Sequence, residues 1–271
     1  MSRTISVVMT TYVGDEVSEL RECFDSLVTQ RRLPDELVVV RDFDLPSELV
    51  AAIDDLEARA DFHVRDVAVD ERGRGHARKV GVERADSEFV AIIDADDIAL
   101  PHRLERQLAF FESNPTVDVA GGFIGEFETS SGEIRAVREV PTDPGAVRRM
   151  AHYRSPVNHP TVMFRRQAVV DAGNYRHMEY GEDYELWCRL LSNDRVLANV
   201  PEVLVKVRAD GVIARRQGWD IAKREIELQR AIVETGFYDW KIALLNLSVR
   251  IPLRFFPKRL LERTYRRYFR S

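Results

Sequence analysis

The first hundred residues alternate between short apolar runs and amphipathic segments. Runs rich in Val and Ile predict buried strands, because β-branched residues favour strands and these runs are too short for core helices. We expect strands at 5–9, 37–40, 64–69 and 89–93. Between them, apolar positions three or four residues apart predict helices at 17–30, 47–59 and 75–84. Strands separated by helices of about 10 to 15 residues indicate βαβ units and a largely parallel sheet.

The pattern loosens after residue 100. We expect helices at 102–112 and 184–191, a strand-rich segment at 117–128 followed by a hairpin turn at 130–132, and a strand at 160–164. From residue 219 the chain is predicted to be helical, with Gly236 ending a helix. We therefore predict an α/β domain at 1–218, with a Rossmann-like half at 1–100 and a second half at 101–218, and a helical extension at 219–271.

Three carboxylates directly follow the fourth predicted strand, in the tetrad Asp94-Ala95-Asp96-Asp97. Ligands of open α/β sheets bind beyond the carboxyl ends of the strands, where Asp94 and Asp96 would face the same side. Oxygen donors of this kind suit Mg²⁺ or Mn²⁺ carrying a phosphate. An acidic cap is the alternative, with Pro101 in the first turn of the next helix and Asp97 solvated before it.

Composition and charge narrow the class of protein. With 271 residues and 45% hydrophobic content, the chain can form one large domain or a domain with an appendage. Cys23 and Cys188 cannot form a disulfide framework or a zinc site, so we expect buried, reduced thiols. The first apolar run is too short for a signal peptide, which predicts a cytoplasmic location.

The net charge of −5 is unevenly distributed. Residues 250–271 contain eight basic side chains against Glu262, a local charge of +7, so residues 1–249 carry −12. The acidic remainder disfavours a nucleic-acid-binding protein.

Six short motifs occur in a specific order along nearly the whole chain, at residues 6–12, 38–42, 73–81, 94–97, 158–161 and 181–183. In this order they resemble the motifs of the family-2 inverting glycosyltransferases. The resemblance implies a GT-A fold, a central mixed, mainly parallel sheet flanked by helices, with a nucleotide-sugar half and an acceptor half.

The resemblance assigns the donor site to the first half of the chain. It places Thr11 and Tyr12 beside the nucleotide and Asp42 at its base, although such residues are also common turn formers and solvated acids. Arg78 matches the family's arginine in a glycine-containing loop that favours phosphate, with surface charge as the alternative. Asp94, Ala95 and Asp96 form the family's Asp-x-Asp motif; Asp96 would bind the metal, and Asp94 would share it or contact the ribose.

The same resemblance assigns the catalytic base to Asp183, beside Glu182. In an inverting transfer, a carboxylate removes the proton of the acceptor hydroxyl as its oxygen attacks the anomeric carbon. Both acids would also be favoured by the dipole of the helix that they begin, and this alternative is compatible with the catalytic one.

Four further residues are additional candidates for contacts with the acceptor or the diphosphate. His159 could instead be a structural hydrogen-bonding residue, and Trp187 could belong to the core. Arg215 and Arg216 resemble the arginine-containing loop that covers the diphosphate in relatives. In this loop the residues run Arg215-Arg216-Gln217-Gly218-Trp219, an order that differs from the Gln, Arg, Trp signature of processive synthases. The difference favours transfer of a single sugar.

The carboxyl-terminal segment interleaves aromatic and aliphatic residues with basic ones. Its longest uncharged stretch, 242–249, is too short to span a bilayer, but a basic amphipathic helix suits an anionic membrane surface. Packing against the catalytic domain or a partner is the alternative. We expect peripheral association with the cytoplasmic face of the membrane.

The sequence thus predicts a metal-dependent inverting glycosyltransferase. It would move one sugar from a nucleoside diphosphate donor, UDP in preference to GDP, to a lipid-linked cell-surface glycan or N-glycan precursor. The alternatives are a non-catalytic membrane-associated scaffold on the same fold and a nucleotidyltransferase.

Overall fold

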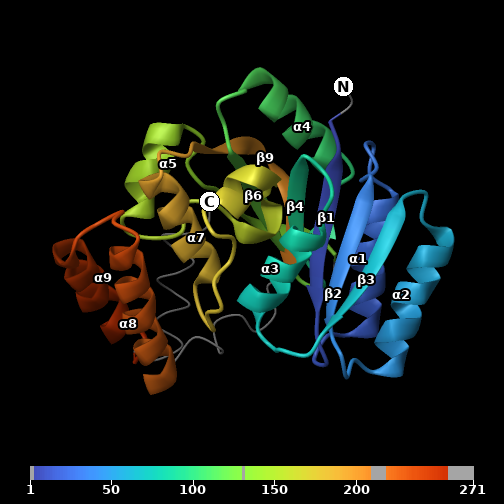
Figure 1. Cartoon of the computed structure of the whole chain (residues 1–271), viewed down its shortest axis with the longest axis horizontal. Helices are drawn as coiled ribbons and strands as arrows, with labels where there is room; N and C mark the ends of the chain where they lie inside the picture. The colour runs from blue at the N-terminus through green and yellow to red at the C-terminus, as the bar shows by residue number, and fades with distance from the viewer. Residues whose placement is uncertain (1–2, 130–131, 209–217, 256–271) are drawn as a thin grey trace.

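The computed structural model describes residues 3–129, 132–208 and 218–255, which form one twisted sheet with helices on both faces (Figure 1). Within these residues the sheet has nine strands, in the order β3-β2-β1-β4-β8-β6-β9-β5, with β7 paired to β6. The expected turn residues 130 and 131 and the candidates Arg215 and Arg216 lie outside the described residues. The α/β class and mixed sheet expected from the sequence are confirmed.

The first half follows the predicted alternation of strands and helices. The strands β1 to β4 are mutually parallel, and every predicted element is present within a few residues of its expected bounds. Apolar side chains of α1 and α2 pack on one face of the sheet, and Val82 of α3 packs on the other. The elements are β1 (Ile5–Thr11), α1 (Val17–Val28), β2 (Glu36–Asp42), α2 (Ser47–Arg59), β3 (His63–Val69), α3 (Arg74–Arg84) and β4 (Phe89–Asp94).

The second half extends this sheet with strands of both directions. Strand β8 pairs antiparallel with β4 and β6, and β6 in turn pairs parallel with β9. The elements are β5 (Ile98–Ala99), α4 (Arg103–Ser113), β6 (Val119–Phe127), β7 (Ile134–Arg138), α5 (Pro144–Ala151), β8 (Met163–Arg165), α6 (Arg166–Asp171), α7 (Glu182–Ser192) and β9 (Leu197–Arg208).

One predicted strand is wrong in its position. Residues His159–Thr161 form a short 3₁₀ helix, and only Met163–Arg165 join the sheet. Proline lacks an amide proton and cannot donate to a sheet ladder, so Pro160 favours a helical first turn over a central strand. His159 is the first residue of this 3₁₀ helix.

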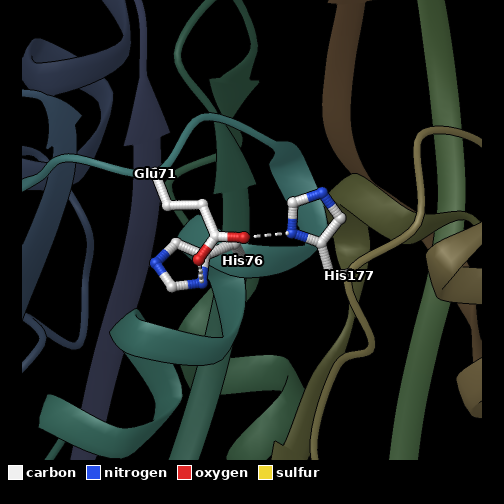
Figure 2. A group of neighbouring side chains, drawn as sticks. All are labelled: Glu71, His76 and His177. Atoms are coloured by element: carbon white, nitrogen blue, oxygen red, sulfur yellow. Dashed lines mark ion pairs between the residues drawn. The ribbon is translucent and has the colours of Figure 1, made fainter.

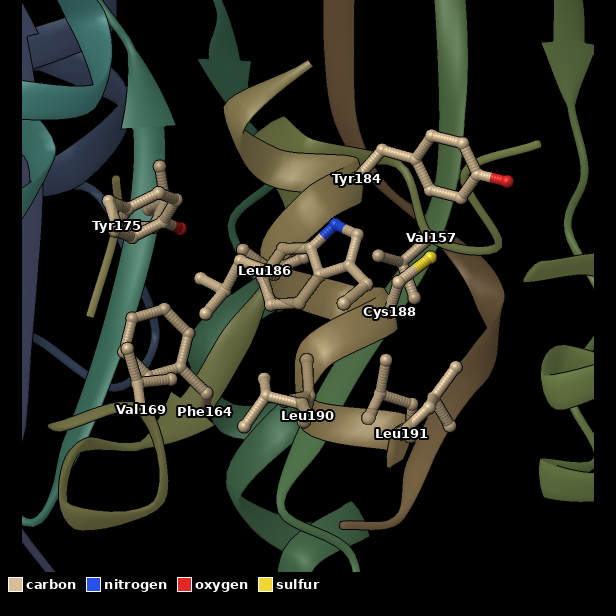
Figure 3. Close-up of a cluster of buried hydrophobic side chains, with 14 of the residues drawn as sticks. Val157, Phe164, Val169, Tyr175, Tyr184, Leu186, Cys188, Leu190 and Leu191 are labelled. Atoms are coloured by element: carbon tan, nitrogen blue, oxygen red, sulfur yellow. The ribbon is translucent and has the colours of Figure 1, made fainter. Parts of the chain in front are cut away.

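Helix α7 is buried on nearly every side. Its side chains Leu186 and Leu190 gather with Phe164 of β8 and Val169 of α6 in one apolar cluster (Figure 3). The free thiol of Cys188 lies in the same cluster, and that of Cys23 is also buried, as expected. This packing fixes the position of the acidic residues that begin the helix.

Two helices, α8 (Trp219–Glu234) and α9 (Trp240–Leu253), follow the sheet domain and lie beside α7 (Figure 1). Leu228 and Ile232 of α8 and Ala243 of α9 belong to the same core cluster as α7. Gly236 follows α8 with a φ of 76°, as expected for the residue after a helix end. None of the helices among the described residues is both long enough and apolar enough to cross a bilayer.

Candidate active site

The carboxyl ends of three neighbouring parallel strands meet at one edge of the sheet. Thr10 of β1 lies opposite both Val40 of β2 and Asp94 of β4. Thr11, which ends β1, and Asp42, which ends β2, are both buried, whereas Tyr12 is exposed. The fold therefore brings these four sequence candidates, Thr11, Tyr12, Asp42 and Asp94, to the same edge.

The acidic tetrad forms a turn instead of continuing the strand. Strand β4 ends at Asp94, and the amide of Asp97 donates to the carbonyl of Asp94 at 3.1 Å. Asp96 is exposed, Ala95 is buried, and 32% of the Asp94 side chain is accessible. Asp96 therefore lies in a turn and not in the strand, so the expected strand alternation is wrong at this point.

The alternative of an acidic helix cap is also wrong. Helix α4 begins at Arg103, its N-cap residue is His102, and no side chain caps it. Asp97 is 2% exposed, so it is not a solvated acid before a helix. Burial and the nearby Asp94 and Asp96 raise the pKa of Asp97 well above its usual value.

Arg78 of α3 joins the two acidic motifs. Its Nη2 atom donates to Asp94 Oδ1 at 2.7 Å, and its Nη1 atom donates to Glu182 Oε1, although Glu182 lies 104 residues further along the chain. Arg78 is buried, and so is Glu182. A buried guanidinium is stable only when such partners compensate it, so this bridge fixes α3, β4 and α7 relative to one another.

The same bridge sets the ionisation of Asp94. Burial would raise the pKa of Asp94, but the adjacent Arg78 outweighs it and holds that pKa below the usual value. Partial desolvation by the surrounding protein atoms and the negative charge of Asp94 raise the pKa of Asp96. The turn therefore contains one carboxylate that is firmly ionised and a second that is repelled by the first.

The sequence analysis missed Asp15, a further acid beside this turn. Asp15 lies in the loop after β1, where it accepts from the amide of Tyr12 at 3.0 Å. Burial raises its pKa to about 6, and the charges of Asp96 and Asp94 act in the same direction. Its position after an apolar strand was the available signal, and it is the same signal that identified Asp94.

Glu182 and Asp183 begin helix α7 as expected. Gly181 precedes them with a φ of 73°, and a Cβ atom there would lie 2.6 Å from Leu228 Cδ2. Only glycine tolerates both the left-handed backbone and this close contact with α8. Gly181 thus fixes how α7 begins, at Glu182, which bonds Arg78, and at the half-buried Asp183.

A group of buried polar rings lies beside the Arg78 bridge. The ring of His159 packs edge-on against Tyr175 at a centroid distance of 5.9 Å and lies 6.0 Å from Trp187. Both ring nitrogens of His159, the Tyr175 hydroxyl and the Trp187 indole nitrogen lack hydrogen-bond partners within the described chain. Burial and the charge of Arg78 lower the pKa of His159 to about 4, so this ring is neutral.

Tyr175 is the second residue that sequence reasoning missed, because no motif contains it. Trp187 is fully buried, so in this structure it offers no open ring face to a sugar.

The chain matches the model of Glycosyl transferase family 2 over residues 6–173, well over half of its length. It belongs to glycosyltransferase family 2.

Several curated relatives cover almost the whole chain, among them two whose names state a role. The amylovoran biosynthesis glycosyltransferase AmsE of Erwinia amylovora is 34% identical over 96% of this chain and 97% of its own length. The UDP-Gal:alpha-D-GlcNAc-diphosphoundecaprenol beta-1,3-galactosyltransferase of Escherichia coli is 29% identical over 98% of this chain and 96% of its own.

Solved structures of low sequence identity share the fold. The S. aureus TarS fragment 1–349 in complex with UDP is 18% identical and aligns with a TM-score of 0.65 over 86% of this chain and 65% of its own. The mannosyltransferase PcManGT of Pyrobaculum calidifontis, in complex with GDP-Man and Mn²⁺, is 19% identical and aligns with a TM-score of 0.61 over 97% of this chain and 79% of its own. The GT-A fold expected for the chain is confirmed.

Proposed function

We propose that this glycosyltransferase is metal-dependent and inverting, and that it transfers a single sugar from a UDP-sugar to a lipid-linked glycan of the cell surface. The observation that carries the proposal is the Arg78 bridge, which ties the acidic turn to the motif containing Asp183. A donor and an acceptor bound at these two motifs would meet between them.

The half of the chain proposed to bind the sugar nucleotide contains carboxylate ligands that fit a divalent cation. Asp94 and Asp96 supply oxygens only, which suit Mg²⁺ or Mn²⁺. Partial desolvation and the negative charge of Asp94 raise the pKa of Asp96, and a bound cation would offset both effects. Bound there, the cation would neutralise the leaving diphosphate. The structure with GDP-Man and Mn²⁺ supports this assignment by analogy of fold.

The other candidate residues would bind the substrates and transfer the proton. Thr11, Tyr12 and Asp42 would hold the nucleoside at the sheet edge, and Arg215 and Arg216 would cover the diphosphate. Asp183 would accept the proton of the acceptor hydroxyl as that oxygen attacks the anomeric carbon and the bond to the diphosphate breaks. Glu182 and His159 would position the base and exclude water.

Two substitutions test these roles. Asp183→Asn should abolish transfer and leave UDP binding intact, whereas Asp96→Asn should weaken metal-dependent UDP binding as well. Asp220→Asn is the matched control, because Asp220 lies in the first turn of α8 as Asp183 lies in the first turn of α7, although Asp220 is the more exposed of the two. Near-normal turnover of the Asp183 variant would contradict its assignment as the base.

The assay is a panel of UDP- and GDP-sugars with Mg²⁺ or Mn²⁺ and polyprenyl-diphosphate-linked saccharide, scored by the mass shift of the lipid. The acceptor class is suggested by the Escherichia coli relative, whose name gives a diphosphoundecaprenol-linked sugar. An added mass of one sugar supports single transfer, and a ladder of masses would contradict it. Donor binding without turnover would favour a scaffold, and sugar-nucleotide formation from a nucleoside triphosphate would favour a nucleotidyltransferase.

Peripheral membrane contact through α9 is a further part of the proposal. Leu244, Leu245 and Val249 are each more than half exposed, while the opposite side of the helix packs on the domain through Ala243. Packing on the domain thus uses one face of α9, and the proposed membrane contact would use the other. Arg250 and Arg254 are already paired with the buried Glu225, so the other six basic residues of the tail, at 258–270, would supply the attraction to anionic lipid.

Vesicle sedimentation tests this contact. The wild-type protein should sediment with phosphatidylglycerol vesicles and less with phosphatidylcholine vesicles. The double variant Leu245→Glu, Val249→Glu should remain in the supernatant, and Ile134→Glu, on an exposed side chain of β7, should behave as wild type. Equal sedimentation of all three proteins would contradict the role of α9.

A further inference from the structure

Two histidines and a glutamate from three separate segments converge beside the amino end of α3 (Figure 2). Glu71 lies in the loop after β3, His76 in the first turn of α3, and His177 in the segment between α6 and α7. Glu71 Oε1 is 2.8 Å from His177 Nδ1, and Glu71 Oε2 is 3.5 Å from His76 Nδ1. One ligand atom from each of the three residues lies within 4.8 Å of the others.

These separations are close to those of a metal site. Bonds of about 2.0 to 2.2 Å in tetrahedral zinc place neighbouring ligand atoms about 3.4 Å apart. The two Glu–His distances already lie near this value, so small side-chain movements would bring the two imidazoles into range. Three protein ligands and one open position match zinc sites that keep a water.

The backbone around the cluster is held in place by contacts that do not depend on the three side chains. A Cβ atom at Gly75 would collide with the carbonyl oxygen of Arg176, so α3 and the segment bearing His177 pack backbone against backbone. The Asn174 side chain donates to the carbonyl of Lys79 in α3 at 3.1 Å. His76 and His177 are thereby presented to each other before any ion binds.

We propose that Glu71, His76 and His177 form a binding site for Zn²⁺ or a similar borderline cation, separate from the acidic turn. Two imidazoles and one carboxylate favour Zn²⁺ over Mg²⁺, whereas the oxygens of Asp94 and Asp96 favour Mg²⁺ or Mn²⁺. The two sites therefore differ in the ion that they select.

The location gives this ion a structural effect. His177 precedes Gly181 and Asp183 by a few residues, and His76 shares helix α3 with Arg78. An ion bound by both histidines would link the segment that leads to Asp183 to helix α3, whose Arg78 bonds Asp94. Binding should raise the thermal stability of the protein, because the ion would bind the folded chain and not the separated segments.

Calorimetric titration of the full chain with ZnCl₂, in a large excess of Mg²⁺ and slightly above neutral pH, tests the site. We expect one equivalent of Zn²⁺ and a rise in melting temperature. His76→Ala and His177→Ala should each weaken binding by at least 10- to 100-fold, since even outer partners of metal ligands contribute about that much. His63→Ala, at an exposed histidine of β3, is the matched control and should bind as wild type.

A fourth variant separates this site from the proposed active site. Asp96→Asn should retain the equivalent of Zn²⁺ whether or not the enzyme proves metal-dependent, because the cluster shares no residue with the acidic turn. Absence of saturable Zn²⁺ binding in the wild type would overturn the proposal and leave the cluster as an ion pair between Glu71 and the histidines. Unchanged affinity in His76→Ala and His177→Ala would overturn it equally.

Discussion

Replacing Arg78 by methionine removes the charge that joins the two acidic motifs while keeping a side chain of similar length. Arg78 is 5% exposed, and its two partners differ in environment: the Glu182 side chain is 9% exposed and that of Asp94 is 32% exposed. Loss of one partner of a buried ion pair costs about 3–5 kcal/mol. We expect a loss in this range, contributed mainly by the stranded Glu182, because water partly screens Asp94.

Urea unfolding at two pH values measures this loss. Without Arg78, burial would hold the pKa values of both carboxyls above those of the unfolded chain. Groups of this kind favour the folded state when protonated, so the variant should regain stability as the pH falls from 7 to 5. Arg21→Met is the control, because its pair with Asp55 is about half exposed and should contribute at most about 1 kcal/mol.

A double variant identifies the stranded charge. Arg78→Met combined with Glu182→Gln should be more stable than Arg78→Met alone, since the neutral amide needs no counter-ion. A loss below about 1 kcal/mol for Arg78→Met, or a loss that does not shrink on acidification, would refute the reasoning about the buried bridge.

Three further predictions concern side chains around the site. Burial lowers the pKa of His159 to about 4 in the folded chain, from its ordinary 6.5, so protonation of this ring favours the unfolded chain. Acidification from pH 6.5 to 4 should therefore remove up to about 3 kcal/mol from the free energy of unfolding, and His159→Gln should flatten that part of the stability-against-pH curve. Gly181→Ala should lower the melting temperature and the transfer rate, and it should do so more than Gly132→Ala, which has a similar positive φ and no atom within 4 Å of the new Cβ. Glu225→Gln should destabilise the protein by about 3 kcal/mol, because it removes the buried carboxylate that pairs with Arg250 and Arg254. Glu234→Gln, in the exposed pair with Arg230, should be nearly neutral in urea unfolding. Equal losses within either matched pair would contradict the packing or charge argument behind it.

The order of elements in the first half was predictable because each strand and helix carries its own pattern. Strands such as β2 are buried on both faces and therefore appear as continuous apolar runs, and helix α2 has the bounds that its spacing predicts. The acidic turn was found by the same local signal.

Strand β9 was not predicted, although it is the longest strand among the described residues. Pro201 interrupts its sequence, and its burial does not follow a simple alternation. Its last residue, Arg208, donates to the carbonyl of Asp96 at 3.0 Å and pairs with Glu19 and Glu22. A residue 112 positions away in the chain thus supports the acidic turn.

The sequence by itself determined the family, the alternation of strands and helices, and the location of an acidic turn at the end of a buried strand. These features depend on residue types within short windows or on motif order. Only the tertiary structure decided that Arg78 links Asp94 to Glu182, that Asp97 is buried, and that Tyr175 and His159 lie beside the bridge. Those contacts join residues far apart in the chain, and the physical cause is the packing of α3 and α7 on one face of the sheet, which no local pattern encodes.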